Sequence, residues 1–542
     1  MKERGKSARR LPWLVILGIV ALLTVPAAGS ADEIDAPVGV DGVLSAEPGT
    51  VLVPEGNALG PAPPSEDALA PRIDLPDAEY AAARERAARG SQARPSGLSD
   101  PSGPNAPPAP QLSCEGVNQT TAGGLRPPDP DVAAGNGHIV TVTNTHVDMY
   151  VKTSFCTAPS KSVSAASFFG YTARTLFDPR VIYDQTWDRW VITFEAFPES
   201  SSVQRFFIGV STTANPLGSF CIYNIDANFQ NDPDFFFDFP MLGHDQDALL
   251  FSANIFNAAG TSFKRAFVFA IAKARMYNCL GFSVPVFQPL GRITIQPPVV
   301  LDQNPNSYFV TSRPAGVATA SNLGKYTATN TSKGFAMTFG GPALIAVPTY
   351  SIPPAAAQPG TISRLDALDA RFQNRSTQIG NSLFQVHTRT FGATTGLPTP
   401  RWYEINTAAN TVIQQGFVFE SGSSHDWNPG IAANASKEVF LCWNSTLPSG
   451  IGAHQARIRC SGRQPADPLG VIGAGFSLFT SPTFYNPTAA AVDRWGDYSY
   501  VALDPLPIGG AACAPNRRAW FFNEKVNAQA VWGTRWGRVG FC

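Results

Sequence analysis

The chain has 542 residues, with 40 lysines and arginines against 41 aspartates and glutamates. This near balance, with charged residues at only 15%, argues against nucleic acid or an anionic membrane as a partner. Glycine and proline number 47 each, which is typical of a loop-rich, all-β extracellular protein and not of a mainly helical one.

The first 31 residues have the features of an export signal. Basic residues precede an apolar run from Leu14 to Val25, and small residues follow as far as Ala31. The run is about a dozen residues, shorter than the ~20 that span a bilayer. We therefore predict a cleaved signal peptide over 1–31, with an uncleaved anchor as the alternative, and no later membrane span. A secreted or periplasmic protein is expected.

Residues 32–112 contain fourteen prolines and a single aromatic residue, Tyr80. Without apolar side chains to bury, the cost of ordering such a segment is not offset, so a disordered linker or propeptide is predicted. Asp77 to Arg89, rich in alanine, arginine and glutamate, predicts one short helix. Because thirteen residues are marginal as an isolated helix, a solvated helix is preferred here to a docked one.

Residues 113–542 are predicted to form the folded domain, since short runs rich in Val, Ile, Phe and Thr alternate with Asn, Gly and Pro. Short helices are expected only at 270–278 and 361–372. The expected strands, in chain order, are 138–150, 181–183, 189–194, 205–211, 248–254, 263–270, 308–312, 344–350, 383–391, 411–420, 439–443, 498–503 and 519–522.

One pattern recurs: an acidic or proline-bounded start, a short strand, an aspartate-rich turn and a second strand. Asp178-Pro179-Arg180 begins the clearest copy. Such recurrence predicts an all-β fold, a β-propeller of about seven four-stranded blades, with six as the alternative. The predicted blade starts are Asp131, Asp178, Asp238, Asn304, Asn381, Asp426 and Asp497.

Four motifs together resemble a group of exported bacterial β-propeller proteins with sialidase-like architecture and mostly unassigned function. They are 127–138 (Pro-Pro-Asp-Pro-Asp leading to Gly-Asn-Gly-His), 178–190, 238–243 and 494–499. The resemblance implies a propeller fold. It implies no reaction, because fold does not carry function.

Equivalent positions in a propeller converge on the central channel, so the residues that open the first strands are candidate ligand-binding residues. Asp131, Asp178, Asp238 and Asp497 could hold Ca²⁺ through their carboxylates, although an aspartate before a strand often only forms a turn. Arg180 would neutralise them or bind an acidic sugar. His244 and His425, which lie in loops beside aspartates, are the candidate acid–base residues. Trp187 and Trp427 are expected in turns, where exposed rings could bind sugar.

Complete catalytic signatures are missing from the sequence. It has no Gly-x-Ser-x-Gly elbow, no His-Glu-x-x-His zinc motif and no Phe-Arg-Ile-Pro segment of the sialidase kind. The preferred hypothesis is therefore a monomeric binding module for an extracellular polysaccharide or protein. The alternative is a polysaccharide-active enzyme, a lyase or glycoside hydrolase, with its site in the central channel.

The chain has eight cysteines, an even number, all beyond the signal segment, and none in a Cys-x-x-Cys pair. Four disulfides in an oxidising compartment are the simplest expectation. Cys442 and Cys460 lie on two strand-like runs of one hairpin, and Cys513 is the nearest partner for the terminal Cys542. The remaining cysteines, with pairing left open, are Cys114, Cys156, Cys221 and Cys279.

Overall fold

The computed structural model describes residues 1, 36–62, 72–89, 94, 108–154, 156–197, 203–473, 475–505 and 513–542. Regular structure in this part of the chain is almost entirely β-strand, as predicted. Apart from Met1, the predicted signal peptide lies outside the described residues and stays a prediction. None of the described helices has the length and apolar character needed to cross a membrane.

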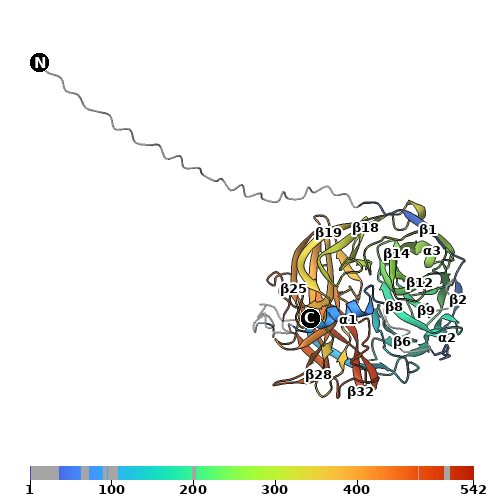
Figure 1. Ribbon diagram of the computed structural model, residues 1–542. Helices are drawn as coiled ribbons and strands as arrows, with labels where there is room; N and C mark the ends of the chain where they lie inside the picture. Colours follow the sequence, from blue (N-terminus) through green and yellow to red (C-terminus); the bar gives the residue numbers. More distant parts are fainter. Residues whose placement is uncertain are drawn as a thin grey trace. The chain divides into compact units, whose positions relative to one another are not determined.

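The strands form successive antiparallel groups of neighbours in sequence (Figure 1). The first group is β4 (Asp131–Ala134), β5 (His138–Thr143), β6 (His146–Val151) and β7 (Lys161–Ser164). The second is β8 (Leu176–Asp184), β9 (Arg189–Ala196), β10 (Arg205–Ser211) and β11 (Phe220–Asp226), and the third is β12 (Phe236–His244), β13 (Ala248–Phe256), β14 (Phe263–Ala272) and β15 (Phe282–Phe287).

The fourth group has three strands, β17 (Asn306–Thr311), β18 (Thr319–Thr329) and β19 (Thr338–Ser351). The fifth is β22 (Ser376–Ile379), β23 (Ser382–Thr390), β24 (Pro398–Asn406) and β25 (Thr411–Phe417), and the sixth is β26 (His425–Ala433), β27 (Val439–Leu447), β28 (His454–Arg463) and β29 (Phe476–Thr480). The last is β31 (Tyr500–Leu503), β32 (Arg518–Ala528) and β33 (Val531–Gly540), completed by β3 (Ala109–Asn118).

The first strands of these groups contact one another in order around a closed series. β4 contacts β8, and β8 contacts β12. The short β16 (Pro298–Val300) pairs in parallel with both β12 and β22. It therefore occupies the position of a first strand for the fourth group. β22 contacts β26, β26 contacts β31, and β31 contacts β4 again. A series of antiparallel sheets that returns to its start is a propeller-type architecture.

The ring is closed by a strand from before the first group. β3 pairs with β33, the last strand of the chain, and places Cys114 opposite Trp536. The rings of Tyr150 and Trp536 lie 4.6 Å apart, so aromatic packing also joins the first group to the last.

The segment before β3 is ordered where it is described, so the predicted disorder of 32–112 is wrong for residues 36–62 and 72–89. β1 (Val40–Ala46) pairs with β15, and β2 (Thr50–Leu52) pairs with β11. Both add to the outer edges of existing sheets. An edge strand offers unpaired N–H and C=O groups, so a chain poor in apolar residues can still be ordered there.

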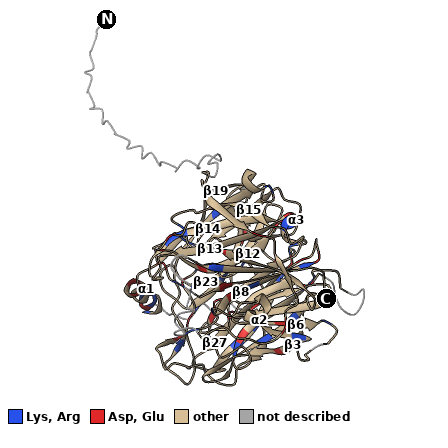
Figure 2. Ribbon diagram, turned by 90° about the vertical axis from the view of Figure 1, so that its right-hand side faces the viewer, with Lys and Arg blue, Asp and Glu red and all other residues tan. Residues whose placement is uncertain are grey.

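The predicted helix is present as α1 (Asp77–Arg89), but it is docked and not solvated. It carries acidic and basic residues along its length (Figure 2). Leu75, just before it, and Ala83 are buried in one cluster with Tyr308 and Tyr350. Small alanines allow the helix to lie close to the sheets, which the composition alone did not indicate.

Of the two other helix predictions, one is confirmed and one is wrong. The 270–278 segment contains a short helix, α3 (Lys273–Met276). The 361–372 segment has no helix; it contains β21 (Arg364–Leu365), which pairs with β20 (Ala356–Ala357) and β30 (Val492–Asp493). Leu368 and Ala370 adopt positive φ angles, which an α-helix cannot contain.

All eight cysteines are paired. The predicted bonds Cys442–Cys460 and Cys513–Cys542 are both confirmed. The other two pairs are Cys114–Cys156 and Cys221–Cys279. Cys442 and Cys460 lie directly opposite each other on β27 and β28, as the hairpin spacing predicts.

Candidate functional site

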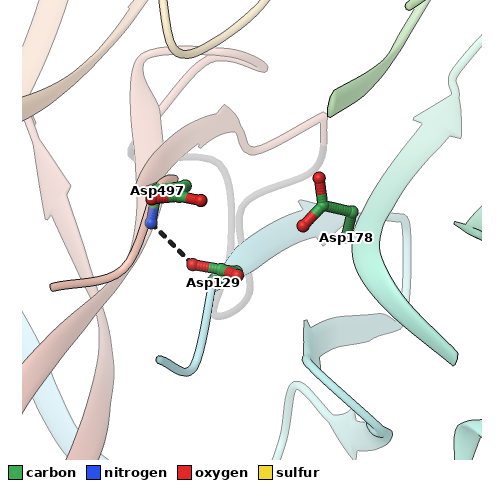
Figure 3. A group of neighbouring side chains, drawn as sticks. All are labelled: Asp129, Asp178 and Asp497. Atoms are coloured by element: carbon green, nitrogen blue, oxygen red, sulfur yellow. Dashed lines mark hydrogen bonds between the residues drawn. The ribbon is translucent and has the colours of Figure 1, made fainter. Parts of the chain in front are cut away.

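Buried carboxylates gather where the first strands begin. Carboxylate oxygens of Asp129, Asp178 and Asp497 lie within 4.8 Å of one another (Figure 3). Asp178 also belongs to a second group with Glu195 and Asp238, within the same distance. All five side chains are at most 2% exposed. We call these five residues the carboxylate cluster.

A repeated backbone feature aims several side chains at this place. Asp129, Asp178, Phe239 and Asn428 each precede a proline and each adopt a φ between 48° and 60°. β8, β12 and β26 have a register irregularity at this same point. Left-handed φ is costly for residues other than glycine and tends to occur at functional sites.

Hydrogen bonds connect the cluster across the ring. The Tyr498 hydroxyl donates to Asp178 Oδ2 at 2.7 Å. Asn144 donates to Asp129 Oδ2 at 2.6 Å and accepts from the Asp178 amide at 2.9 Å. The Asp497 amide donates to Asp129 Oδ1 at 2.6 Å. The residues just before β31 and the turn after β5 thus hold the carboxylates of Asp129 and Asp178 in place.

Some of the cluster's hydrogen-bonding capacity is unused. Among the described residues, Asp178 Oδ1 and Asp497 Oδ2 are buried and accept no hydrogen bond. Leaving a buried polar atom unpaired costs about 1–3 kcal/mol, so such atoms in native proteins usually have a reason. These oxygens are available to a proton, a cation or a ligand.

Burial and mutual repulsion raise the pKa values of several of these groups. Burial raises the pKa of Asp178 and of Glu195 well above the ordinary range, and the charges of neighbouring cluster carboxylates raise both further. Burial also raises the pKa of Asp238, but the charges of Arg72 and Arg371 and the Arg72 amide oppose that rise. Burial and neighbouring negative charge thus favour the protonated form of Glu195, whereas positive charge favours the ionised form of Asp238.

Arginines supply the compensating charge. The Arg180 guanidinium lies 3.2 Å from the centre of the Tyr498 ring and donates to the Pro240 carbonyl at 3.0 Å. Arg494 pairs with Asp497 at 2.6 Å. Arg375 pairs with Asp131 through two bonds of 2.8 and 3.2 Å.

The structure brings together three of the four aspartates that were predicted to converge. Asp178, Asp238 and Asp497 come together, and Arg180 lies beside them. Asp131, in contrast, is held by Arg375 and by the Val181 amide and is not a member of the cluster. Its place is taken by Asp129.

The sequence contained a signal for Asp129. Asp129-Pro130-Asp131 aligns with Asp178-Pro179-Arg180 through the proline, which makes Asp129 the counterpart of Asp178 and Asp131 that of Arg180. Matching the predicted blade starts instead pairs Asp131 with Asp178, which is two residues away from the match that the prolines give. Tyr498 and Arg375 had no such local signal, because only the ring brings Tyr498 to Asp178 and Arg375 to Asp131.

The predicted histidines lie elsewhere. The Ala357 amide donates to His425 Nδ1 at 3.3 Å. Burial, with Arg94 and Arg364 nearby, lowers the pKa of His425 to about 3. His244 ends β12, six residues after Asp238, which is about 20 Å along a strand. Burial and the Lys273 charge lower its pKa to about 4, so both rings stay neutral at working pH.

Of the two tryptophans predicted to be exposed, one is exposed and the other is buried. Trp187 is 50% exposed, as expected. Trp427 is fully buried, with its ring 5.5 Å from that of Trp495, so its predicted exposure is wrong. Trp427 lies in the first strand β26, which is covered on both faces, and not in a turn.

A cavity of about 120 Å³ lies at the opposite ends of the first strands. Its lining includes Ala134, Tyr183, His244, Thr377, Ala432 and Leu503. Tyr500 and Arg375 also line it, and Arg375 connects it to Asp131. The carboxylate cluster and this cavity therefore mark two ends of the same channel.

Comparisons with known proteins identify no family, since neither a family model nor a curated protein matches the chain. Among solved structures, a Trypanosoma rangeli sialidase is 10% identical at a TM-score of 0.33, over 68% of this chain and 55% of the sialidase. The chain thus spans about half the length of that sialidase.

Two further structures are similarly distant. An exo-beta-1,3-galactanase from Phanerochaete chrysosporium is 8% identical at a TM-score of 0.31, over 80% of this chain and 99% of that one. A thermostable family-43 glycoside hydrolase is 14% identical at 0.27, over 56% and 92%. Likeness at this level carries no argument about fold or activity, so both depend on the chain's own residues.

Proposed function

We propose that the strand groups are the blades of a seven-bladed propeller. The closed series of first strands supports this number, with β16 completing the fourth blade. Strands β1 and β2 then add a fifth, outer strand to the third and second blades. The ring would be closed by β3, from the N-terminal side of the first blade.

We propose that the protein is a polysaccharide-active enzyme, a glycoside hydrolase, with its site at the carboxylate cluster. One observation carries this proposal: Glu195 and Asp238 lie together, and neighbouring carboxylates add to the burial that raises the pKa of Glu195, whereas arginine charges oppose the rise at Asp238. A protonated and an ionised carboxylate side by side would provide the acid and the nucleophile that retaining glycoside hydrolysis requires.

The roles follow from these states. Protonated Glu195 would donate its proton to the departing glycosidic oxygen as the bond to the sugar breaks. Ionised Asp238 would attack the sugar carbon, and water would later release the product. The short distance between the two groups favours this retaining mechanism, because an inverting pair is separated widely enough to admit a water. Asp178, held by Tyr498, would position Glu195.

A test compares turnover of a glycan panel by the purified protein and by two variants, with new reducing ends as the readout. Glu195→Gln and Asp238→Asn should each lower turnover at least ~100-fold, the usual size of an acid–base contribution. Glu404→Gln is the matched control, because Glu404 is equally buried but lies on β24 with Ser382 and Gln414 as partners. Turnover that survives both cluster substitutions would remove the proposed site.

We keep calcium as a proposal for the same cluster. Asp129, Asp178 and Asp497 supply the carboxylate oxygens that this ion prefers. The fit is partial, because both Asp129 oxygens accept hydrogen bonds and Arg494 already pairs with Asp497. Bound calcium would supply positive charge and would compete with the protons of the cluster.

A binding module for an extracellular polysaccharide or protein is the second candidate. It is favoured by the burial of the proposed catalytic pair, since Glu195 and Asp238 are each only 2% exposed. Binding of a glycan without turnover, in the same panel, would select it. For either function we propose a secreted or periplasmic monomer, and the four disulfides support an oxidising location.

A further inference from the structure

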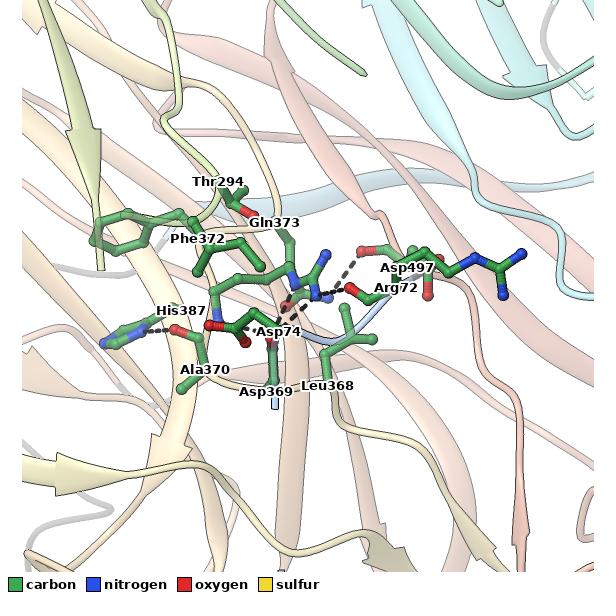
Figure 4. A network of polar contacts seen from close by, with 12 residues as sticks. Arg72, Asp74, Thr294, Leu368, Asp369, Ala370, Phe372, Gln373, His387 and Asp497 are labelled. Carbon is green, nitrogen blue, oxygen red and sulfur yellow. Dashed lines mark hydrogen bonds and ion pairs between the residues drawn. The ribbon is translucent and has the colours of Figure 1, made fainter. Parts of the chain in front are cut away.

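Part of the segment before the propeller covers the carboxylate cluster. We call residues 72–89 with Arg94 the arm. The Arg72 amide donates to Asp238 Oδ2 at 3.1 Å, so the arm contacts the proposed nucleophile directly. Arg371 Nη2 donates to the Arg72 carbonyl at 2.7 Å. Figure 4 shows Arg72 and Asp74 in a polar network that reaches the Asp497 region.

Asp74 makes the most specific contact of the arm. Its two carboxylate oxygens bind the Arg313 guanidinium at 2.6 and 2.9 Å, and the Gly316 amide donates to it at 2.7 Å. Bidentate pairing of this kind is strong and directional. The guanidinium of Arg313 is thus arranged to hold a carboxylate, and the arm provides one.

Without the arm, this part of the body would be short of negative charge. Arg313 would keep Asp369 at 2.7 Å, but Asp369 also pairs with Arg371 at 2.7 Å. Two arginines would then share one carboxylate within the buried network. A site that loses a buried ionic partner takes up another charge of the same sign, because an unpaired buried charge is expensive.

Two further ion pairs place the arm. Arg84 pairs with Asp366 at 2.9 Å, and Arg94 pairs with Asp426 at 3.2 Å with both side chains fully buried. Buried ion pairs add little net stability, because desolvation offsets their attraction. These pairs therefore fix where the arm lies, whereas the apolar contacts of Leu75 and Ala83 supply the burial that holds it.

We infer that the arm is an intramolecular occupant of a glycan-binding surface, and that a carboxylate-bearing glycan displaces it by placing a carboxylate on Arg313. This inference rests on the proposed function, since it assigns the ligand class and the regulation of that same site. The closed arm blocks Asp238. A ligand that binds only the open form has its affinity reduced by the fraction of molecules that are open.

The test uses the full chain, with hydrogen–deuterium exchange of residues 73–89 and binding of oligogalacturonate as readouts. Asp74→Asn keeps the shape of the arm and removes its charge. It should speed exchange in the arm and tighten oligogalacturonate binding, both by about tenfold, since weakening the closed state raises the open fraction. Asp77→Asn is the matched control, because Asp77 is exposed on the same arm.

In the unchanged protein, oligogalacturonate should speed exchange of the arm, and neutral malto-oligosaccharide should not. Unchanged exchange in Asp74→Asn, unchanged arm protection with oligogalacturonate bound, or no binding to either protein would each overturn the inference. Turnover is scored separately. Faster arm exchange with no turnover of any glycan would support the arm's role and remove the proposed activity. Turnover of a glycan while the arm stays fully protected would support the proposed activity and remove the arm's role.

Discussion

Tyr498 and Asp178 are 320 residues apart in the sequence, yet the tyrosine hydroxyl donates a 2.7 Å hydrogen bond to the aspartate in the centre of the ring. The Arg180 guanidinium lies on the same tyrosine ring. This pair joins the last group of strands to the second. It therefore contributes to the closure of the ring and also to the charge state of the carboxylate cluster.

The first prediction concerns this bond. Tyr498→Phe removes the hydroxyl that donates to Asp178 Oδ2 and should lower the free energy of unfolding by about 1–3 kcal/mol, the cost of an unpaired buried acceptor. Turnover of any glycan substrate should also fall, because Asp178 is no longer held beside Glu195. Urea unfolding and a turnover assay measure the two effects.

Tyr183→Phe is the matched control for that substitution. Its hydroxyl donates to Asp188 at 2.5 Å, at the other end of β8 from Asp178. It should lose stability of a similar order and leave turnover unchanged. Equal losses of turnover in both variants would contradict the place given to Tyr498.

The second prediction compares a buried with a surface ion pair. Arg375→Met leaves Asp131 buried without its partner and should cost about 3–5 kcal/mol of unfolding free energy. Arg517→Met breaks a bidentate pair with Glu438 whose arginine is 37% exposed, and should cost less than about 1 kcal/mol. Similar losses in urea unfolding would show that Asp131 does not depend on Arg375.

The third prediction is a pH dependence. Burial lowers the pKa of His387 to about 3, and the neutral ring binds the Ala370 carbonyl and the Tyr403 hydroxyl. Because the unfolded chain binds a proton near pH 6.5, stability from this group is complete above that pH. It falls by about 1.4 kcal/mol per unit as the pH drops from 6.5 toward 3.

A His387→Gln variant lacks this titration. The difference in unfolding free energy between it and the unchanged protein should therefore shrink as the pH is lowered from 7 to 5, measured by urea unfolding at each pH. Taking the difference between the two proteins removes the contribution of the other titrating groups to the pH dependence, because both proteins contain them. A difference that is constant with pH would show that the ring titrates alike in the folded and unfolded protein.

The fourth prediction tests calcium. If the ion binds among Asp129, Asp178 and Asp497, calcium at 100 times its dissociation constant should stabilise the protein by about 2.7 kcal/mol. EDTA should reverse the effect, and Asp178→Asn should weaken it. A melting temperature that responds to neither calcium nor EDTA would indicate that protons and arginines alone neutralise the cluster.

The sequence predicted those features that depend on near neighbours. The bounds of α1 follow from the composition of residues 77–89, and the Cys442–Cys460 bond follows from hairpin spacing. The strand–turn–strand repeat predicted all-β structure, and its acidic starts predicted that Asp178 and Asp238 would lie close together, as they do. In each case the determining interactions lie within a few residues or recur at equivalent positions.

Other features depend on which strands become neighbours in space. The choice between Asp129 and Asp131 depends on where the chain adopts positive φ before a proline, and Asp131 is neutralised by Arg375, 244 residues away. The burial of Trp427 and the ordering of the arm likewise come from partners far along the chain, such as Trp495 and Arg313. Composition measures what a segment can bury by itself. It does not measure the sheet edges and unpaired charges that a completed ring offers to that segment.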